Sequence, residues 1–469
     1  GNGFKLPYIH EIDGCQVPSW VSNTVWYQIF PERFANGNPN LTPDGAREWD
    51  AEISPERDDF FGGDLQGIID HLDYLKDLGI TGLYLCPIFE ATTNHKYDTT
   101  DYFEIDRHFG DKEVFANLVE EAHKRGIKIM LDAVFNHIGY QSAQWQDVLK
   151  NGENSPYKDW FHIQEFPVTE DKLQKPRELP YHTFAFASYM PKLNTANPEV
   201  KEFLLSVATY WIENFGIDAW RLDVANEIDH QFWRDFRKAV LAKKPDLYIL
   251  GEIWHTSQPW LQGDEFHAVM NYPLSESIKD YFLRQRKKTE QFISEINSQS
   301  MYYKQQISEV MFNLLDSHDT ERILTTANGN IQHVKAALTF LYLQKGTPCI
   351  YYGTELALKG GPDPDCRRVM PWDRVSEDND MLNFMKKLIK VRKEVASIIQ
   401  HGNYCLEEVK PDVLSLKWNY QGKEVQAIFN QSSENFILER DSVDLSSHCQ
   451  FEDGQQVILP DGFIITVSR

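Results

Sequence analysis

The chain has 469 residues, and its 47 basic and 70 acidic side chains give a formal net charge of −23. Hydrophobic residues make up 42% and charged residues 25%, as in globular proteins, and no apolar run approaches the roughly 18 residues that a membrane helix needs. We therefore expect no membrane partner. Nucleic acid is also excluded as a main partner, because phosphate backbones require clustered Lys and Arg. A neutral or cationic ligand fits this acidic chain better.

The start of the chain and its cysteines indicate a reducing compartment. Residues 1–4 do not read as a signal peptide, and the absence of an initiator Met leaves open whether a segment precedes them. None of the 6 cysteines falls in a C-x-x-C pair, and Cys86 and Cys349 lie in apolar runs, where they read as small hydrophobic residues. We expect free thiols and a cytoplasmic location.

Apolar strands alternate with amphipathic helices over most of the chain. β-Branched and aromatic runs predict the strands, and apolar residues at helical spacing predict the helices. In chain order we expect strand 24–30, helix 65–78, strand 82–88, helix 113–124, strand 128–135, helix 200–214, strand 219–224, helix 231–242, strands 248–253, 268–272 and 311–316, helix 334–344 and strand 349–353. Eight apolar strands with helices between them predict an α/β fold, a parallel (β/α)₈ TIM barrel.

Two intervals depart from this alternation of strands and helices and indicate further domains. Some sixty residues rich in Pro, Gly, Asn and aromatics follow the third strand, too many for an ordinary loop. After about residue 397, short alternating runs separated by turns predict an antiparallel β-sandwich domain. The expected domains are the barrel at 1–136 and 195–398, an inserted domain at 137–194 and the C-terminal β domain at 399–469.

Charged and polar residues gather where the apolar strands end. Asp223, Glu252 and Asp319 follow three different strands, and in a TIM barrel such strand ends meet at one face. Arg221 lies two residues before Asp223, so both side chains point to the same face of the strand. A plain buried ion pair explains Arg221 and Asp223 about as well as a functional pair does, when they are taken alone.

Several carboxylates without a Cys/His metal cluster suit the cleavage of glycosidic bonds. One carboxyl acts as the general acid and another attacks the sugar, while a third raises the pKa of the acid. Arg221 is expected to keep Asp223 ionised. His137 and His318 can donate to sugar hydroxyls, although each histidine alone would more often be structural.

Four segments resemble the signature regions of the α-amylase family of glycoside hydrolases, in the family's order. These segments are DAVFNH (132–137), WRLDVANE (220–227), GEIWH (251–255) and SHDTER (317–322). The resemblance implies Asp223 as the nucleophile, Glu252 as the general acid/base and Asp319 as the group that stabilises the transition state. It further implies contacts to the cleaved sugar from His137, Arg221, His318 and the stacking residue Tyr97.

A finer resemblance is to the subgroup of cyclomaltodextrinases, neopullulanases and maltogenic amylases. The stretch MPKLN (190–194) is similar to the marker of that subgroup, and DPDCRR (363–368) to its loop after strand eight. This resemblance implies that Asp363 and Arg367 hold the sugar on the non-reducing side. Glu227 and Trp254 fit positions on the acceptor side, with packing as the alternative role.

The chain also departs from this subgroup in two places. Members usually carry an additional N-terminal β domain used in dimerisation, whereas this chain begins just before the barrel, so the oligomeric state stays open. Some members bind calcium near the first strand, and the candidate ligands here are Asn36, Asn38, Gly62 and Asp64. Residues 41–43 (LTP) replace an expected acidic cluster, and calcium prefers several charged oxygen ligands. We expect no required cofactor, with calcium as the one candidate cation and a weak or absent site favoured.

The sequence thus predicts a retaining α-glucan hydrolase. Its expected substrates are oligosaccharides: cyclodextrins, maltooligosaccharides and pullulan. Cleavage is expected at α-1,4 bonds, with α-1,6 bonds left open as a second linkage, and with some transglycosylation. One alternative is an α-1,6-glucosidase or sucrose isomerase on the same fold, against which MPKLN argues. A noncatalytic sugar-binding protein and a purely structural ion-pair network are the others. A missing carboxylate would mark a noncatalytic protein, and none is missing.

Overall fold

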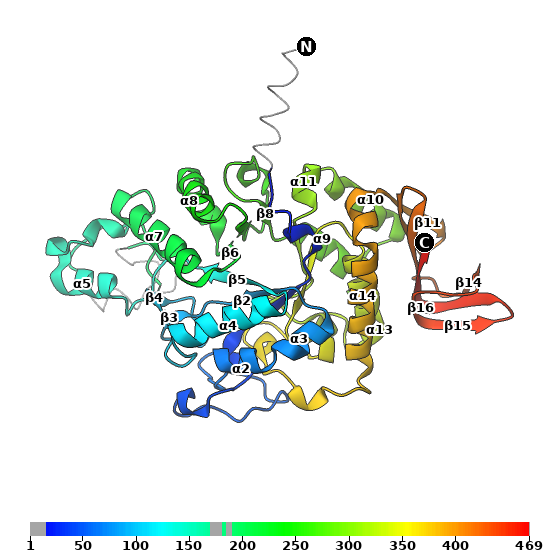
Figure 1. Cartoon of the computed structure of the whole chain (residues 1–469), viewed down its shortest axis with the longest axis horizontal. Helices are drawn as coiled ribbons and strands as arrows, with labels where there is room; N and C mark the ends of the chain where they lie inside the picture. Colours follow the sequence, from blue (N-terminus) through cyan, green and yellow to red (C-terminus); the bar gives the residue numbers. More distant parts are fainter. Residues whose placement is uncertain (1–15, 169–180, 184–189, 469) are drawn as a thin grey trace, which may run out of the picture.

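Eight parallel strands close into a barrel in the computed structural model, which describes residues 16–168, 181–183 and 190–468 (Figure 1). The strand order is β8-β7-β6-β5-β2-β1-β10-β9, and a parallel bridge between Met270 and Phe312 joins the two ends. The strands are β1 (Trp26–Ile29), β2 (Gly82–Leu85), β5 (Lys128–Ala133), β6 (Ala219–Leu222), β7 (Tyr248–Gly251), β8 (Ala268–Val269), β9 (Phe312–Asn313) and β10 (Thr347–Tyr351). The predicted TIM barrel is confirmed.

Seven of the eight barrel strands are shorter than predicted, and β10 has the predicted length but begins two residues earlier. These early strand ends form the rim. β6 ends at Leu222 and β7 at Gly251, so Asp223 and Glu252 stand directly beyond the ladder. Their backbone N–H groups still donate to the neighbouring strands, from Asp223 to Ala133 O at 3.0 Å and from Glu252 to Leu222 O at 2.9 Å. The backbone is therefore anchored where each carboxylate projects.

Helices surround the barrel, and four of them match the predicted spans 113–124, 200–214, 231–242 and 334–344 to within three residues. They are α2 (Leu65–Asp70), α3 (Leu72–Leu78), α4 (Lys112–Lys124), α7 (Pro198–Phe215), α8 (His230–Lys243), α9 (Tyr272–Ile278), α10 (Thr289–Ser300), α11 (Gln305–Ser308), α12 (Ile323–Thr326), α13 (Ile331–Tyr342) and α14 (Asp380–His401). The single helix predicted at 65–78 was wrong. His71, at φ −112° and ψ 13°, leaves the helical conformation and separates α2 from α3.

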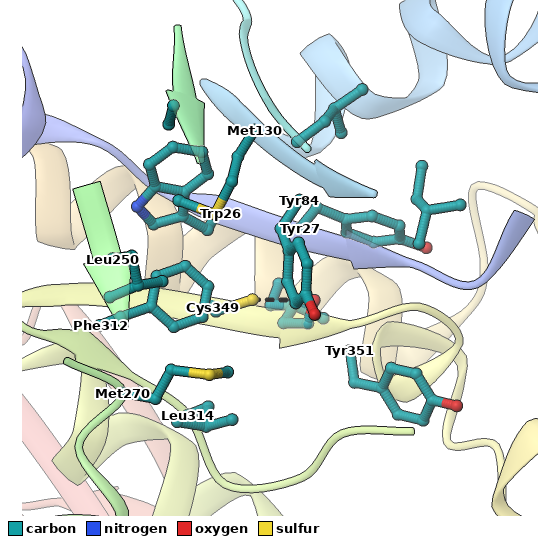
Figure 2. Packing of buried hydrophobic residues seen from close by; sticks show 14 of the residues in the cluster. Trp26, Tyr27, Tyr84, Met130, Leu250, Met270, Phe312, Leu314, Cys349 and Tyr351 are labelled. Atoms are coloured by element: carbon teal, nitrogen blue, oxygen red, sulfur yellow. Dashed lines mark hydrogen bonds between the residues drawn. The ribbon is translucent and has the colours of Figure 1, made fainter. Parts of the chain in front are cut away.

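Aromatic side chains from several strands fill the barrel interior (Figure 2). The ring of Phe312 on β9 lies 5.8 Å from that of Trp26 on β1 and 6.1 Å from that of Tyr84 on β2. All three residues are at most 1% exposed. Close-packed interiors resist rearrangement, so the strands hold the rim in a fixed geometry.

The segment after β5 carries α5 (Ala143–Asn151) and two short 3₁₀ turns, Gly152–Asn154 and Lys158–Trp160. Antiparallel bridges join His137 to Lys192 and Phe161 to Leu193, so the segment returns to the barrel where it left. Residues 169–180 and 184–189 of the predicted inserted domain lie outside the described residues. The hairpin of β3 (Phe89–Ala91) and β4 (Thr99–Ile105) was not predicted.

An antiparallel six-stranded sheet follows α14 and lies on the opposite side of the barrel from α5 (Figure 1). Its strands are β11 (Asn403–Lys410), β12 (Val413–Tyr420), β13 (Lys423–Asn430), β14 (Phe436–Glu439), β15 (Leu445–Glu452) and β16 (Gln455–Ser468). The predicted C-terminal β domain is confirmed, while the domain boundaries stay predictions. No helix within the described part of the chain is long and apolar enough to cross a membrane.

Candidate active site

A cavity of about 890 Å³ opens at the rim where the strands end. The predicted site residues that line it are Tyr97, Asp223, Glu227, Glu252, Trp254, His318, Asp319, Asp363 and Arg367. The three carboxylates predicted for the chemistry therefore meet at one cavity. His137 and Arg221 do not line it and are 0% exposed. The structure places these two side chains behind the cavity wall.

Arg221 connects three carboxylates from three neighbouring strands. Its Nη1 lies 2.7 Å from Asp223 Oδ1 and 3.2 Å from Asp132 Oδ2, and its Nη2 donates to Glu252 Oε2. The predicted Arg221–Asp223 pair is present, but it is one part of a shared arrangement. One buried cation cannot neutralise three buried carboxylates, so this site carries excess negative charge when all of them are ionised.

Asp132 at the end of β5 is the anchor of this arrangement. Its Oδ2 accepts hydrogen bonds from the hydroxyls of Tyr84 and Tyr97, each at 2.7 Å, while Arg221 contacts the same carboxylate. Burial raises the pKa of Asp132 to about 6, against the opposing effect of Arg221. Asp132 thus fixes both the guanidinium and the phenol of Tyr97 at the edge of the cavity.

The backbone N–H of Val224 donates a hydrogen bond to Glu252. Its N–H lies 2.9 Å from Glu252 Oε1, and its φ of 45° places it in the left-handed region. A β-branched residue rarely adopts that conformation, which costs of order 1–3 kcal/mol and persists where the surroundings enforce it. This local strain lies directly after Asp223, where the strand end must present one carboxylate and orient another.

Burial raises the pKa of both Asp223 and Glu252. For Asp223 the second cause is the neighbouring Glu252, and Arg221 opposes both effects. For Glu252, Arg221 also opposes the effect of burial, while Asp319 adds to it. The expectation that Arg221 keeps Asp223 ionised therefore holds only in part. Both carboxyls lie against the same guanidinium, and a single proton on the pair would relieve their repulsion.

Asp319 is held on the other side of the cavity by His318 and Arg367. Its Oδ2 lies 3.2 Å from His318 Nε2, and its Oδ1 lies 3.7 Å from Arg367 Nη2. Arg367 also pairs with Asp363 at 3.1 Å. The Asp319 side chain is 38% exposed, so it can meet a ligand that enters the cavity.

Tyr97 and His318 form a flat wall of the cavity. Their rings are stacked, with centroids 5.4 Å apart and planes 5° from parallel. An aromatic face of this kind can pack against the apolar face of a sugar ring. The predicted stacking role of Tyr97 is compatible with this geometry and stays a prediction.

His137 is engaged within the protein, and its predicted contact with the sugar stays a prediction. Its Nε2 lies 3.1 Å from the carbonyl oxygen of Tyr97, and its Nδ1 lies 3.3 Å from the side-chain amide of Asn136. Burial lowers the pKa of His137 to about 3, so the ring is neutral. Both ring nitrogens are used within the protein, and in this structure His137 supports Tyr97 rather than facing the cavity.

The acceptor side of the cavity is open. Trp254 is 40% exposed and stacks on Tyr272 with ring centroids 3.6 Å apart. The side chain of Glu227 is 51% exposed, and its Oε2 lies 3.6 Å from Lys192 Nζ, within the MPKLN stretch. Met190 of the same stretch lines the cavity. An exposed ring beside polar groups is suited to an incoming sugar.

The candidate calcium ligands are engaged with one another. Asp64 is 0% exposed, and its carboxylate accepts from the backbone N–H groups of Gly37, Asn38 and Gly67 at 2.7–2.9 Å. Asn36 donates to Thr42 and to the Gly62 carbonyl, each at 2.7 Å. One carboxylate saturated by N–H donors does not fit calcium, which prefers several free charged oxygens. Among the described residues no three His, Cys, Asp or Glu side chains form a metal cluster.

Four residues of the site carried no predicted role. Asp132 stood at a recognised strand end, so its position was visible in the sequence. Tyr84 and Gln28 lie within apolar strands, and their contacts to Asp132 and His318 span 48 and 290 positions of the chain. His95 lines the cavity, and the Tyr97 N–H donates to its Nδ1 at 3.0 Å. Its position two residues before Tyr97, in the segment 95–102 (HKYDTTDY), was the one available signal.

The comparisons with known proteins agree with this geometry. The model of the alpha amylase catalytic domain matches residues 28–437. The intracellular maltogenic amylase of Bacillus subtilis (strain 168) is 54% identical over 432 residues, 92% of this chain and 72% of that protein. A cyclomaltodextrinase of Geobacillus thermopakistaniensis (strain MAS1) is 54% identical over 433 residues, with the same coverage. A solved cyclomaltodextrinase structure has a TM-score of 0.88 at 45% identity and covers 98% of this chain and 80% of its own.

Neutralising Asp223 is expected to stabilise the fold. The pKa of Asp223 is raised in the folded state, so its ionised form destabilises the fold at all pH values above that pKa. In Asp223→Asn the amide keeps an oxygen for Arg221 and offers an N–H to Glu252. We expect a Tm about 1–2 °C higher near neutral pH, because the unfolding entropy of about 2.1 cal/mol/K per residue makes the shift from about 1 kcal/mol small in a chain of 469 residues. The gain shrinks as the pH falls and wild-type Asp223 becomes protonated.

Thermal unfolding followed by circular dichroism at several pH values measures this difference. The control is Asp378→Asn, which removes the same charge from an exposed surface position. An Asp223→Asn variant that unfolds below the wild type near neutral pH would mean that the ion pair with Arg221 stabilises the fold overall.

Removal of divalent cations is expected to leave the protein unchanged. The Asp64 carboxylate is satisfied by backbone donors, so dialysis against EDTA should alter neither Tm nor kcat/KM. Differential scanning calorimetry with and without added CaCl₂ measures the effect on stability. A rise in Tm with calcium that disappears in Asn36→Ala would place a calcium site at this loop after all.

Proposed function

The chain belongs to the alpha-amylase family of glycoside hydrolases, and we propose that it hydrolyses α-1,4-glucans with retention of anomeric configuration. The observation that carries this proposal is the meeting of Asp223, Glu252 and Asp319 at one cavity, with Arg221 behind two of them. Two carboxyl groups that line one cavity and share one guanidinium are the elements of a double displacement at a sugar carbon. A noncatalytic protein would have no need to hold them against their mutual repulsion.

The mechanism assigns a different task to each carboxyl. Asp223 attacks the anomeric carbon while Glu252 donates its proton to the glycosidic oxygen, which leaves with the reducing-side fragment. Glu252 then takes a proton from water, which attacks the same carbon and releases Asp223. The shared proton of the Asp223–Glu252 pair is suited to this exchange, because one member must be ionised while the other is protonated.

Asp319, His318 and Tyr97 orient the sugar during these steps. Asp319 accepts from ring hydroxyls, and its charge stabilises the developing oxocarbenium ion. Tyr97 packs against the sugar face, and Arg367 with Asp363 binds the next residue on the non-reducing side. These assignments rest on the cavity geometry and on the positions of the family's signature segments.

The substrates that fit are cyclodextrins and maltooligosaccharides, with pullulan as a further substrate. The relatives at 54% identity are named maltogenic amylase and cyclomaltodextrinase. Trp254 and Glu227 at the open acceptor side can hold a second sugar in place of water, so we include transfer to sugar acceptors. The Bacillus subtilis relative is named intracellular, which supports the same location for this chain.

Loss of either reacting carboxyl should abolish turnover. Asp223→Asn removes the attacking oxygen's charge, and we expect kcat on γ-cyclodextrin to fall by more than about 10³-fold. Glu252→Gln removes the transferable proton, which is worth about 10²–10⁴-fold. Release of reducing sugar measures both, and Glu377→Gln, an exposed surface change, is the matched control. Near wild-type turnover in either site variant would refute the assigned roles.

A further inference from the structure

Gln28 is a buried polar side chain of β1 that belongs to none of the four signature segments. It is 1% exposed, and its amide Nε2 lies 2.8 Å from Nδ1 of His318 and 3.4 Å from Cys86 Sγ. A buried amide in an otherwise apolar strand destabilises the fold unless its polar atoms are hydrogen-bonded. Its strongest contact is to a residue of the active site.

His318 is held as a neutral ring with both nitrogens engaged. Burial and then the nearby charges of Arg367 and Arg221 lower its pKa well below the usual range. A neutral imidazole carries one proton, so one nitrogen donates and the other accepts. On the side away from Gln28, Nε2 lies 2.8 Å from the Tyr97 hydroxyl and 3.2 Å from Asp319 Oδ2.

The partners of Nε2 decide which nitrogen carries the proton. The single hydroxyl proton of Tyr97 is donated to Asp132 at 2.7 Å, so towards His318 this oxygen can only accept. An ionised Asp319 also only accepts. Both partners of Nε2 therefore require a proton on Nε2. The Nδ1 atom is left as an acceptor, and the donor that faces it is the Gln28 amide.

We propose that Gln28 is a positioning residue that sets the tautomer of His318. By donating to Nδ1 it keeps the ring proton on Nε2, directed at Tyr97 and Asp319 on the cavity side. The proton then holds Asp319 in place and is available to a sugar hydroxyl beside it. This inference rests on the proposed function for the importance of Asp319, whereas the tautomer itself can be measured without turnover.

Two substitutions separate the tautomer from simple packing. Gln28→Met keeps the length of the side chain and removes the donor. Gln28→Glu keeps the shape and replaces the donor with an acceptor, which demands a proton on Nδ1. The other charged or titratable groups that face His318 are Arg367, Arg221, His95, Asp319 and Tyr97. None of them is altered by either change.

The tautomer can be measured by long-range ¹H–¹⁵N NMR on protein labelled at its 15 histidines. Signals that vanish in His318→Gln identify the ring. We expect Nδ1 to be unprotonated in the wild type and protonated in Gln28→Glu. A wild-type ring with its proton on Nδ1, or a Gln28→Glu ring without one, would overturn the proposal.

Kinetics test whether the tautomer matters. We expect kcat/KM on γ-cyclodextrin to fall about 10–100-fold in both Gln28 variants, as is common when an orienting partner is lost. Only Gln28→Glu should gain a new ionisation in its pH–rate profile, because its carboxylate raises the pKa of His318. The control Cys86→Ala removes the weaker sulfur partner of Gln28 and should keep both the tautomer and kcat/KM.

Two outcomes contradict the proposal directly. Wild-type kcat/KM in Gln28→Met would show that the donor is dispensable. An equal loss in Cys86→Ala with an unchanged tautomer would show that packing, and not the proton, is responsible. Failure of the proposed function would appear differently, as turnover retained in Asp223→Asn while the His318 signals remain as expected.

Discussion

The buried guanidinium of Arg221 is the contact on which the active site depends. It lies against carboxylates from the ends of β5, β6 and β7, and its burial limits the screening of these ion pairs by solvent. Removing this one cation would leave three buried carboxylates uncompensated, at a cost of several kcal/mol. The three strand ends are therefore bound to one another through a single side chain, and the positions of Asp223 and Glu252 follow from it.

The cluster of Arg221 and its three carboxylates carries more negative than positive charge. Burial first, and then the neighbouring carboxylates, raise the pKa of Asp223 and Glu252 against the opposing effect of Arg221, which favours retention of a proton by the pair. Glu252 additionally accepts from the backbone N–H of the strained Val224, which fixes its orientation. The carboxyl that holds the proton can thus act as the acid, and the ionised one can act as the nucleophile. Such a site is built at the expense of stability, as is common where function needs excess charge.

Much of the fold and of the active site could be predicted from the sequence, because the informative patterns are local. The strand ends with Asp223, Glu252 and Asp319 follow directly from apolar runs, and the period of two in a strand placed Arg221 beside Asp223. Contacts between distant elements could not be predicted. Asp132 was visible but not its link to Arg221. Gln28 reaches His318 only because barrel closure brings β1 within two strands of β9, the strand that precedes His318. The break at His71 was missed because the apolar spacing continues through it, and His137 turned inward to a backbone carbonyl that no pattern reveals.

The assignment of Asp223 as the nucleophile is tested most directly by trapping the covalent intermediate. A fluorinated α-glucosyl fluoride supplies a good leaving group, while its ring fluorine slows the release of the sugar from the enzyme. Mass spectrometry of the digested protein should find one added sugar on the peptide that contains Asp223, and none in Asp223→Asn. A sugar attached to Glu252 or Asp319, or an inverted product formed without any covalent intermediate, would contradict the double displacement.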